Sequence, residues 1–355
     1  MIAWELAGTV ARSVAGAGGG GVVPEPLPGD LADLGRRAEE AVVAYTGLEP
    51  RAPLPTPQDV SRGEWADANI GLMRTLIEPL AATLDERAAQ LPGAVRSVAG
   101  SALGAEIGAL LGYMGRRVLG QYEVSLAAGE RADAQPPRLL LVGGNLRESA
   151  VRLEAPLEDL LAWVTVHEVT HAVQFSSVPW LQDHIGGLVA ELLAGADVSL
   201  DAGRAGVPDL SDLRALVARA RDGGLATLVA GPERRDLLDR IQATMALVEG
   251  HAEHVMDAAG GPLVPDLPRL RAQLERRRAE RSPLASILDR LLGLEMKLRQ
   301  YRDGKAFCDA VVAHEGTAGL NRAFAGPELL PTSAELADPL AWIARSRMRE
   351  LPRSV

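Results

Sequence analysis

The sequence predicts a mainly α-helical (α+β) protein with a small β-sheet. Aromatic residues make up only 3% of the 355 residues, so the core must be built from Ala, Leu and Val. Ala and Leu favour helix, and apolar residues recur with helical spacing along most of the chain. The best candidate for a strand is one short apolar segment, Arg138 to Gly143, which follows two prolines and precedes Gly144 and Asn145.

Capping residues and prolines set the borders of the expected helices. Asp30 is a plausible N-cap, four prolines between residues 49 and 57 form a connector, and Pro92 breaks a long helical segment. The expected helices are a short one within the first thirty residues, then 30–45, 58–126 with the break at Pro92, 155–175, 179–199, 210–221, 234–259, 268–280 and 283–302, followed by short helices between 305 and 345.

Composition and charge argue against several classes of protein. Hydrophobic residues make up 47% and charged residues 24%, which is typical of a globular chain and not of a disordered one. The net charge of −10 makes the chain a poor binder of phosphate backbones, so we expect no nucleic-acid partner. The single cysteine, Cys308, excludes an internal disulfide framework and a cysteine-rich zinc site.

The N-terminal segment lacks the features of a targeting signal. It carries Glu5 and Arg12, and it has no basic start followed by an apolar block and a cleavage site. The longest apolar stretch, residues 97–119, is interrupted by Glu106 and by two arginines. We therefore expect a cytoplasmic protein that does not interact with a membrane.

Three glycines, Gly104, Gly108 and Gly112, recur every four residues and so fall on one face of the expected helix. Such a stripe allows another backbone to approach closely. It is compatible with a membrane dimerisation seam or with tight packing inside a helical core. The charged residues in and beside the segment favour packing in a core.

The segment from Trp163 to Phe175 carries the pattern H-E-x-x-H, formed by His167, Glu168 and His171. Residues four apart share a helix face, so both imidazoles can bind one metal ion. Glu168 lies at the edge of that face, where it can reach a water molecule on the metal. Two histidines without a ligand role are the alternative, but the apolar flanks indicate a buried helix, in which histidines need partners.

This segment resembles the active-site helix of the zincin superfamily of metallopeptidases, especially of thermolysin-like enzymes. The resemblance implies one Zn²⁺ bound by His167 and His171, with Glu168 as the general base. Residues 247–257 are similar to the segment of aminopeptidase-N-like and thermolysin-like enzymes in which a glutamate supplies the third zinc ligand. By that resemblance Glu249 is the third ligand, and Glu253 supports the first zinc histidine.

The helical spacing of the second segment is consistent with this assignment. Glu249 and Glu253 are one turn apart and share a face. His251 lies about 200° around the helix from Glu249, so the two side chains cannot readily serve one ion. His251 as the third ligand remains an alternative, and so does a charged helix face exposed to solvent. One feature departs from thermolysin-like enzymes, because 77 residues separate His171 from Glu249. Helices in that gap could wall or cover the cleft.

The whole chain is also similar to one family of uncharacterised bacterial zincin-like hydrolases, some of them labelled as associated with deazaflavin-cofactor biosynthesis. The resemblance implies a zincin-like helical core and one family-wide unit, 1–355, with an N-terminal helical region, 1–130, and a metal-site region, 131–355. The matching segments are 4–7, 120–122, the strand ending at Asn145, both metal segments and 297–307.

These observations predict a zinc metallopeptidase that cleaves a peptide or small amide substrate. Tyr301 is a candidate transition-state donor and Lys297, four residues before it, a candidate anchor for a substrate carboxylate; a surface tyrosine beside a solvated lysine is the alternative. The rival function is a non-catalytic, zinc-stabilised or ligand-binding protein with a closed site. A closed structural site has four protein ligands, whereas a catalytic site keeps one position for water. The sequence does not indicate the oligomeric state.

Overall fold

The structure, a computed structural model, describes residues 2–16, 25–89, 92–124, 136–194, 232–279 and 294–350. Contacts divide the chain into two compact units. Unit 1 comprises Met1–Gly186 and Val255–Glu275, and unit 2 comprises Gly187–His254 and Arg276–Val355. These borders differ from the border at residue 130 that the sequence suggested, and the single family-wide unit stays a prediction. The fold class, mainly α with a small β-sheet, is confirmed.

Unit 1 contains the three strands of the described chain and six helices that lie wholly within this unit. Three further helices are shared with unit 2. The complete helices are α1 (Trp4–Gly16), α2 (Leu31–Thr46), α3 (Arg62–Ala88), α4 (Gly93–Gly115), α5 (Gly143–Leu153) and α6 (Leu157–Ser177). The shared helices are α7 (Pro179–Ala194), α9 (Pro232–Ala259) and α10 (Leu267–Ala279).

The sheet of unit 1 has the order β1-β3-β2. The central strand β3 (Leu139–Val142) is buried along its whole length and matches the strand expected from the sequence. It pairs in parallel with β1 (Pro57–Val60) and antiparallel with β2 (Gly120–Tyr122). Two strands of the sheet are therefore edge strands, and one of them, β2, makes contacts with α6.

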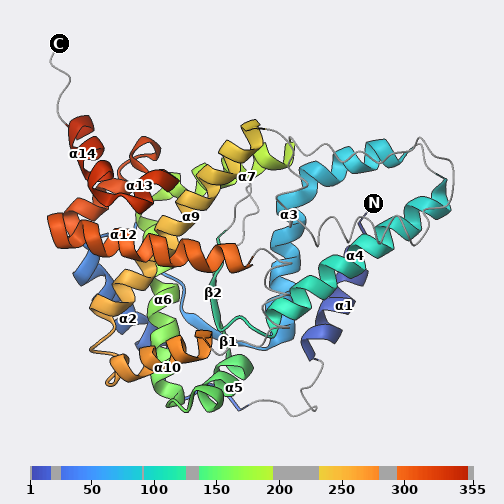
Figure 1. The fold of residues 1–355 in the computed structure, drawn as a ribbon. Coiled ribbons are helices and arrows are strands. Elements are labelled where there is room, and N and C mark those ends of the chain that lie inside the picture. The colour runs from blue at the N-terminus through green and yellow to red at the C-terminus, as the bar shows by residue number, and fades with distance from the viewer. Residues whose placement is uncertain are drawn as a thin grey trace. The chain divides into compact units, whose positions relative to one another are not determined.

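Helices α1, α3 and α4 pack on one another as a three-helix group of unit 1 (Figure 1). The glycine stripe of α4 lies against the backbone of α1. A Cβ added at Gly104 would lie 2.5 Å from the Ala3 carbonyl oxygen, and one at Gly112 would lie 2.6 Å from that of Ala11. By length and composition α4 is the one helix in the described chain that could cross a membrane. The structure uses its glycine face for packing against α1, as the second interpretation of the stripe predicted.

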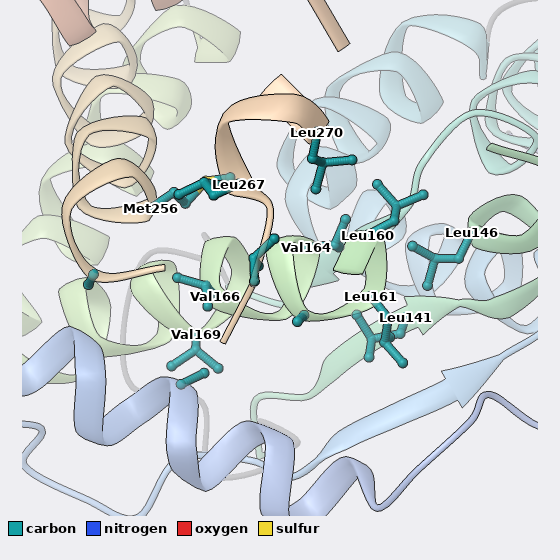
Figure 2. Close-up of a cluster of buried hydrophobic side chains, with 14 of the residues drawn as sticks. Leu141, Leu146, Leu160, Leu161, Val164, Val166, Val169, Met256, Leu267 and Leu270 are labelled. Atoms are coloured by element: carbon teal, nitrogen blue, oxygen red, sulfur yellow. The ribbon is translucent and has the colours of Figure 1, made fainter. Parts of the chain in front are cut away.

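The main hydrophobic core of unit 1 surrounds α6, as Figure 2 shows. Leucine and valine side chains of α6 meet side chains from β3, α5, α10 and the last turns of α9. Buried aliphatic area of this kind contributes about 25 cal/mol per Å² to stability. The residues labelled in Figure 2 are Leu141, Leu146, Leu160, Leu161, Val164, Val166, Val169, Met256, Leu267 and Leu270. The core therefore holds α6 on several sides.

Within unit 2, α9 packs closely against α12 (Leu294–Asn321). A Cβ added at Gly250 would fall on the backbone of Gly304, and it would lie 2.5 Å from the Lys305 nitrogen. Nearby, His254 Nδ1 lies 2.7 Å from Asp309 Oδ1, and the second oxygen of Asp309 accepts a hydrogen bond from the Lys305 ammonium group at 2.6 Å. These contacts fix the part of α9 that carries Glu249.

The C-terminal part of unit 2 consists of short helical elements joined by arginine contacts. Arg345 binds both oxygens of Glu335 and donates to the carbonyl oxygens of Glu328 and Leu330. The elements are η2 (Arg322–Phe324), η3 (Pro327–Leu329), α13 (Ser333–Ala337) and α14 (Pro339–Glu350).

Several expected elements are corrected by the structure. The helix predicted over 58–126 gives way to strand at both ends, because β1 and β2 owe their stability to pairing with β3 and not to a local pattern. Residues 143–153 form α5, which the sequence analysis did not predict. The expected break after residue 302 is absent, since α12 runs on to Asn321 with a kink at Gly316. The helix expected at 210–221 lies outside the described residues.

Candidate metal centre

Helix α6 presents the two histidines of the H-E-x-x-H pattern on one face. Pro156 precedes its first turn, where Glu158 and Asp159 lie at the positive end of the helix dipole. Most residues of the helix are buried, whereas His167 and His171 are half-buried. Their rings meet edge to face, with centroids 4.6 Å apart. The spacing of four residues therefore brings the two imidazoles together as the sequence predicted.

Each histidine uses its Nδ1 for a partner within the protein. His171 Nδ1 lies 2.9 Å from Gln174 Oε1, and His167 Nδ1 lies 2.9 Å from Met256 Sδ. A carbonyl oxygen and a thioether sulfur only accept hydrogen bonds, so these contacts favour the tautomer in which each Nδ1 carries the proton. Both Nε2 atoms therefore present a lone pair, and these two atoms lie 3.2 Å apart.

Two facing lone pairs repel each other, and a cation that both can bind removes this repulsion. Ligand atoms that lie 2.0–2.1 Å from a tetrahedral zinc ion are about 3.3–3.4 Å from one another. The observed separation of 3.2 Å between the Nε2 atoms of His167 and His171 is close to this value. Neutral imidazole is also a preferred zinc ligand. The two side chains therefore fit a zinc ion.

Glu249 completes a group of three side chains that could hold a metal ion. One ligand atom from each of His167, His171 and Glu249 lies within 4.8 Å of the other two. Glu249 precedes Met256 on α9 by seven residues, or about two helical turns, so these two side chains share a helix face. Within the described part of the chain, no other group of His, Cys, Asp and Glu side chains gathers this closely.

Glu168 lies beside this group and is buried, with only 6% of its surface exposed. The backbone N–H of Tyr122 in β2 donates a hydrogen bond to Glu168 Oε2 at 2.8 Å. The Tyr122 ring stacks on Phe175, with centroids 6.3 Å apart. Burial raises the pKa of the Tyr122 hydroxyl, so this group keeps its proton at neutral pH. Strand β2 thus supplies a backbone partner for the carboxylate expected to act as base.

A family model described as zincin-like metallopeptidase matches residues 2–343, nearly the whole chain. The chain belongs to the zincin-like metallopeptidase family. A crystal structure from Chloroflexus aurantiacus, described as a "putative hydrolase with a novel fold", is 30% identical in sequence. The similarity covers 99% of this chain and 100% of that chain, with a TM-score of 0.69. A search of curated proteins found no match.

The other predicted site residues of this zincin-like chain are not part of the His–His–Glu group. Glu253 lies on α9, half-buried and one turn after Glu249, and its contact with the first zinc histidine stays a prediction. His251 is 2% exposed, and its ring meets that of Phe324 with centroids 5.0 Å apart. The His–His–Glu group includes Glu249 and not His251. Tyr301 belongs to α12, but its side chain lies outside the described residues.

Sequence reasoning missed three contributors to this zincin-like site: Gln174, Met256 and the Tyr122 N–H group. Gln174 follows His171 by three residues, so the helical period could have placed it on the same face. Met256 follows Glu249 by seven residues and could have been found by the same argument. The Tyr122 contact spans 46 residues of sequence and depends on sheet pairing, for which no local pattern exists.

Proposed function

We propose that this protein is a zinc-dependent peptidase in which His167, His171 and Glu249 bind the metal ion. The observation that carries the proposal is the pair of Nε2 atoms 3.2 Å apart, each belonging to a histidine whose Nδ1 contacts an acceptor atom of the protein. Membership of the zincin-like metallopeptidase family supports the same chemistry. The carboxylate of Glu249 contributes the negative charge that a divalent cation favours.

Each side chain has a distinct role in the proposed reaction. A zinc ion held by His167, His171 and Glu249 would supply Lewis-acid chemistry at this site. Glu168 accepts the proton of the attacking water and passes it to the leaving amine. Gln174 and Met256 hold the two imidazoles in the tautomer that turns Nε2 toward the ion. Tyr301 remains the proposed transition-state donor.

The number of protein ligands favours catalysis over a structural role. The group among the described residues has three members, and a zinc ion with three protein ligands keeps a position for water. A structural site would use a fourth protein ligand. The closed, non-catalytic site therefore remains the alternative function that an experiment has to exclude.

An extended peptide is the substrate that the neighbouring strand fits best. Leu119 and Glu123 form backbone hydrogen bonds with β3, so the backbone groups of Gly120 and Tyr122 between them are directed to the other edge of β2. The Tyr122 N–H on this edge already donates to Glu168, so an extended chain can pair through main-chain hydrogen bonds only with the remaining backbone groups. Edge recognition of this kind supports a peptide in preference to a small amide.

The substitution Glu168→Gln tests the proposal. Glutamine keeps the size of the side chain and can accept the Tyr122 hydrogen bond, but it cannot serve as the general base. We expect the zinc content to stay at about one ion per chain and the cleavage rate on a mixed peptide library to fall about 10²–10⁴-fold. Rates and zinc content are measured on the same preparations.

A zinc-loaded wild-type protein that cleaves no more than Glu168→Gln would refute the peptidase proposal for that library. The non-catalytic alternative would then be the better explanation.

A cytoplasmic location and the absence of membrane and nucleic-acid partners also remain proposals, since they rest on the composition and the N-terminal sequence alone.

A further inference from the structure

Strand β2 lies against the carboxylate of Glu168 at two of its three residues. Tyr122 donates its backbone N–H to Glu168 Oε2 at 2.8 Å. Two residues earlier, the Cα atom of Gly120 faces the same side chain. A Cβ added at Gly120 would lie 2.8 Å from Glu168 Cγ and 3.0 Å from Glu168 Oε1. Tyr122 therefore contacts Glu168 through its backbone N–H, and Gly120 through the space that a side chain would occupy.

The space beside Gly120 is closed on a second side by the same helix. The added Cβ would also lie 2.8 Å from Cγ1 of Val164, one turn before Glu168 on α6. Val164 is 3% exposed, and its β-branched side chain has little rotamer freedom in a helix. Neither neighbour can move away easily, so even a methyl group at position 120 would displace the Glu168 side chain or push β2 away from α6.

We propose that Gly120 is a positioning residue for Glu168. The absent side chain lets β2 approach α6 closely enough for the Tyr122 N–H to hold Oε2 of the base. In the proposed reaction the carboxylate held in this way accepts the proton of the attacking water. The steric part of this inference stands on its own, whereas its catalytic consequence rests on the proposed peptidase function.

A double-mutant cycle in thermal stability tests the steric part without any assay of activity. Gly120→Ala should lower the melting temperature by about 2–6 °C, because overpacking of a filled space is destabilising. In a Glu168→Ala background, which lacks Cγ and both carboxylate oxygens, the same change should lower the melting temperature clearly less, because only the close contact with Val164 remains. Gly144→Ala is the matched control, because an added Cβ there meets no atom within 4 Å.

Two further backgrounds identify the neighbour that causes the effect. Glu168→Gln keeps Cγ and a terminal oxygen, so Gly120→Ala should remain as costly there as in the wild type. Val164→Ala removes the other close neighbour. A smaller cost of Gly120→Ala in the Glu168→Ala background supports the proposal, whether or not Val164→Ala also reduces that cost. The proposal would be overturned if only Val164→Ala reduced the loss of melting temperature caused by Gly120→Ala, or if that loss were equal in all backgrounds.

Hydrogen exchange of a peptide covering residues 119–123 gives a second measurement that does not require the Gly120 variant to fold. The Tyr122 amide should exchange faster in Glu168→Ala than in the wild type, while Glu168→Gln should keep most of the protection. Unchanged protection in Glu168→Ala would contradict the proposed bond.

The catalytic consequence appears as a split between kcat and KM. Gly120→Ala should lower kcat about 10–100-fold, with KM changed by less than about threefold and the zinc content unchanged, because a displacement of about 1 Å can cost 10²-fold in rate. An unchanged kcat in an active enzyme would overturn the positioning role. If the wild type cleaves no peptide, the proposed function fails, and the stability cycle still decides whether Gly120 positions Glu168.

Discussion

Helices α4 and α6 of unit 1 are both long and apolar, yet they bury different groups. Helix α4 buries several glycines, and two of them, Gly108 and Gly112, lie against carbonyl oxygens of α1. Helix α6 buries large aliphatic side chains together with four polar ones, Thr165, Glu168, Thr170 and Gln174. Hydropathy alone does not separate these two helices, whereas the identity of the buried polar groups does.

The partners of the four polar groups on α6 separate packing from function. Thr165 and Thr170 donate to carbonyl oxygens one turn earlier in their own helix, at 2.8 and 2.7 Å. Glu168 accepts from a strand 46 residues away in sequence, and Gln174 accepts from His171. A buried polar side chain with a partner in its own backbone needs no further explanation. A buried polar side chain whose partner is a distant strand or a candidate metal ligand, as for Glu168 and Gln174, indicates the candidate metal centre.

The largest effect is expected from His171→Ala, which removes a proposed zinc ligand from α6. The zinc content should fall from about one ion per chain to nearly none, because only one histidine and one carboxylate would remain. His314→Ala, at an exposed position of α12, is the control and should keep its zinc. Elemental analysis of both variants makes the measurement, and a stoichiometric zinc content in His171→Ala would break the assignment of α6 as the metal helix.

The identity of the proposed third ligand can be tested in the same way as the histidines of α6. Glu249→Ala should weaken zinc binding strongly, because Glu249 belongs to the group that gathers within 4.8 Å. His251→Ala should mainly lower the melting temperature, because it removes a ring packed against Phe324. Zinc titrations monitored by a competing chelator compare the two variants. The opposite ranking of affinities would assign the third ligand to His251.

The stability of α4 should depend on its glycines while metal binding does not. A Cβ in Gly108→Ala would fall on the Ala7 carbonyl oxygen, so we expect a loss of about 1–3 kcal/mol. Gly93→Ala on the same helix meets no atom within 4 Å and should be neutral or slightly stabilising. Denaturant unfolding gives the stability, and elemental analysis of the folded fraction gives the zinc content. Loss of zinc from folded Gly108→Ala would show that α4 does more than pack.

Among the variants expected to change metal binding, Gln174→Leu should have the smallest effect. This change removes the acceptor of the His171 Nδ1–H group but keeps a similar volume in a fully buried position. Loss of such a supporting contact weakens metal affinity about 10–100-fold. Thr170→Val is the matched control, because Thr170 bonds to its own helix. Equal zinc affinities for the two variants would remove Gln174 from the site.

The parts of the site that follow a helical period could be predicted from the sequence. His167, Glu168 and His171 form a local pattern, and a resemblance added Glu249 on a second helix. The edge strands β1 and β2 could not be found, because strands of four and three residues form only when β3 is beside them. The contact of Met256 with His167 joins residues 89 positions apart, so it depends on how the helices pack around the core.

The packing of α1 on α4 has a consequence for folding during synthesis. The Ala3 carbonyl oxygen lies against Gly104, about one hundred residues further along the chain. A ribosome that adds about 5–20 residues per second needs about 5–20 s to make the intervening chain. During that time the alanine face of α1, which is buried in the finished protein at Ala7, Ala11 and Ala15, has no partner on α4. The nascent chain can therefore cover this apolar face only in part, by packing it on α3, until α4 emerges.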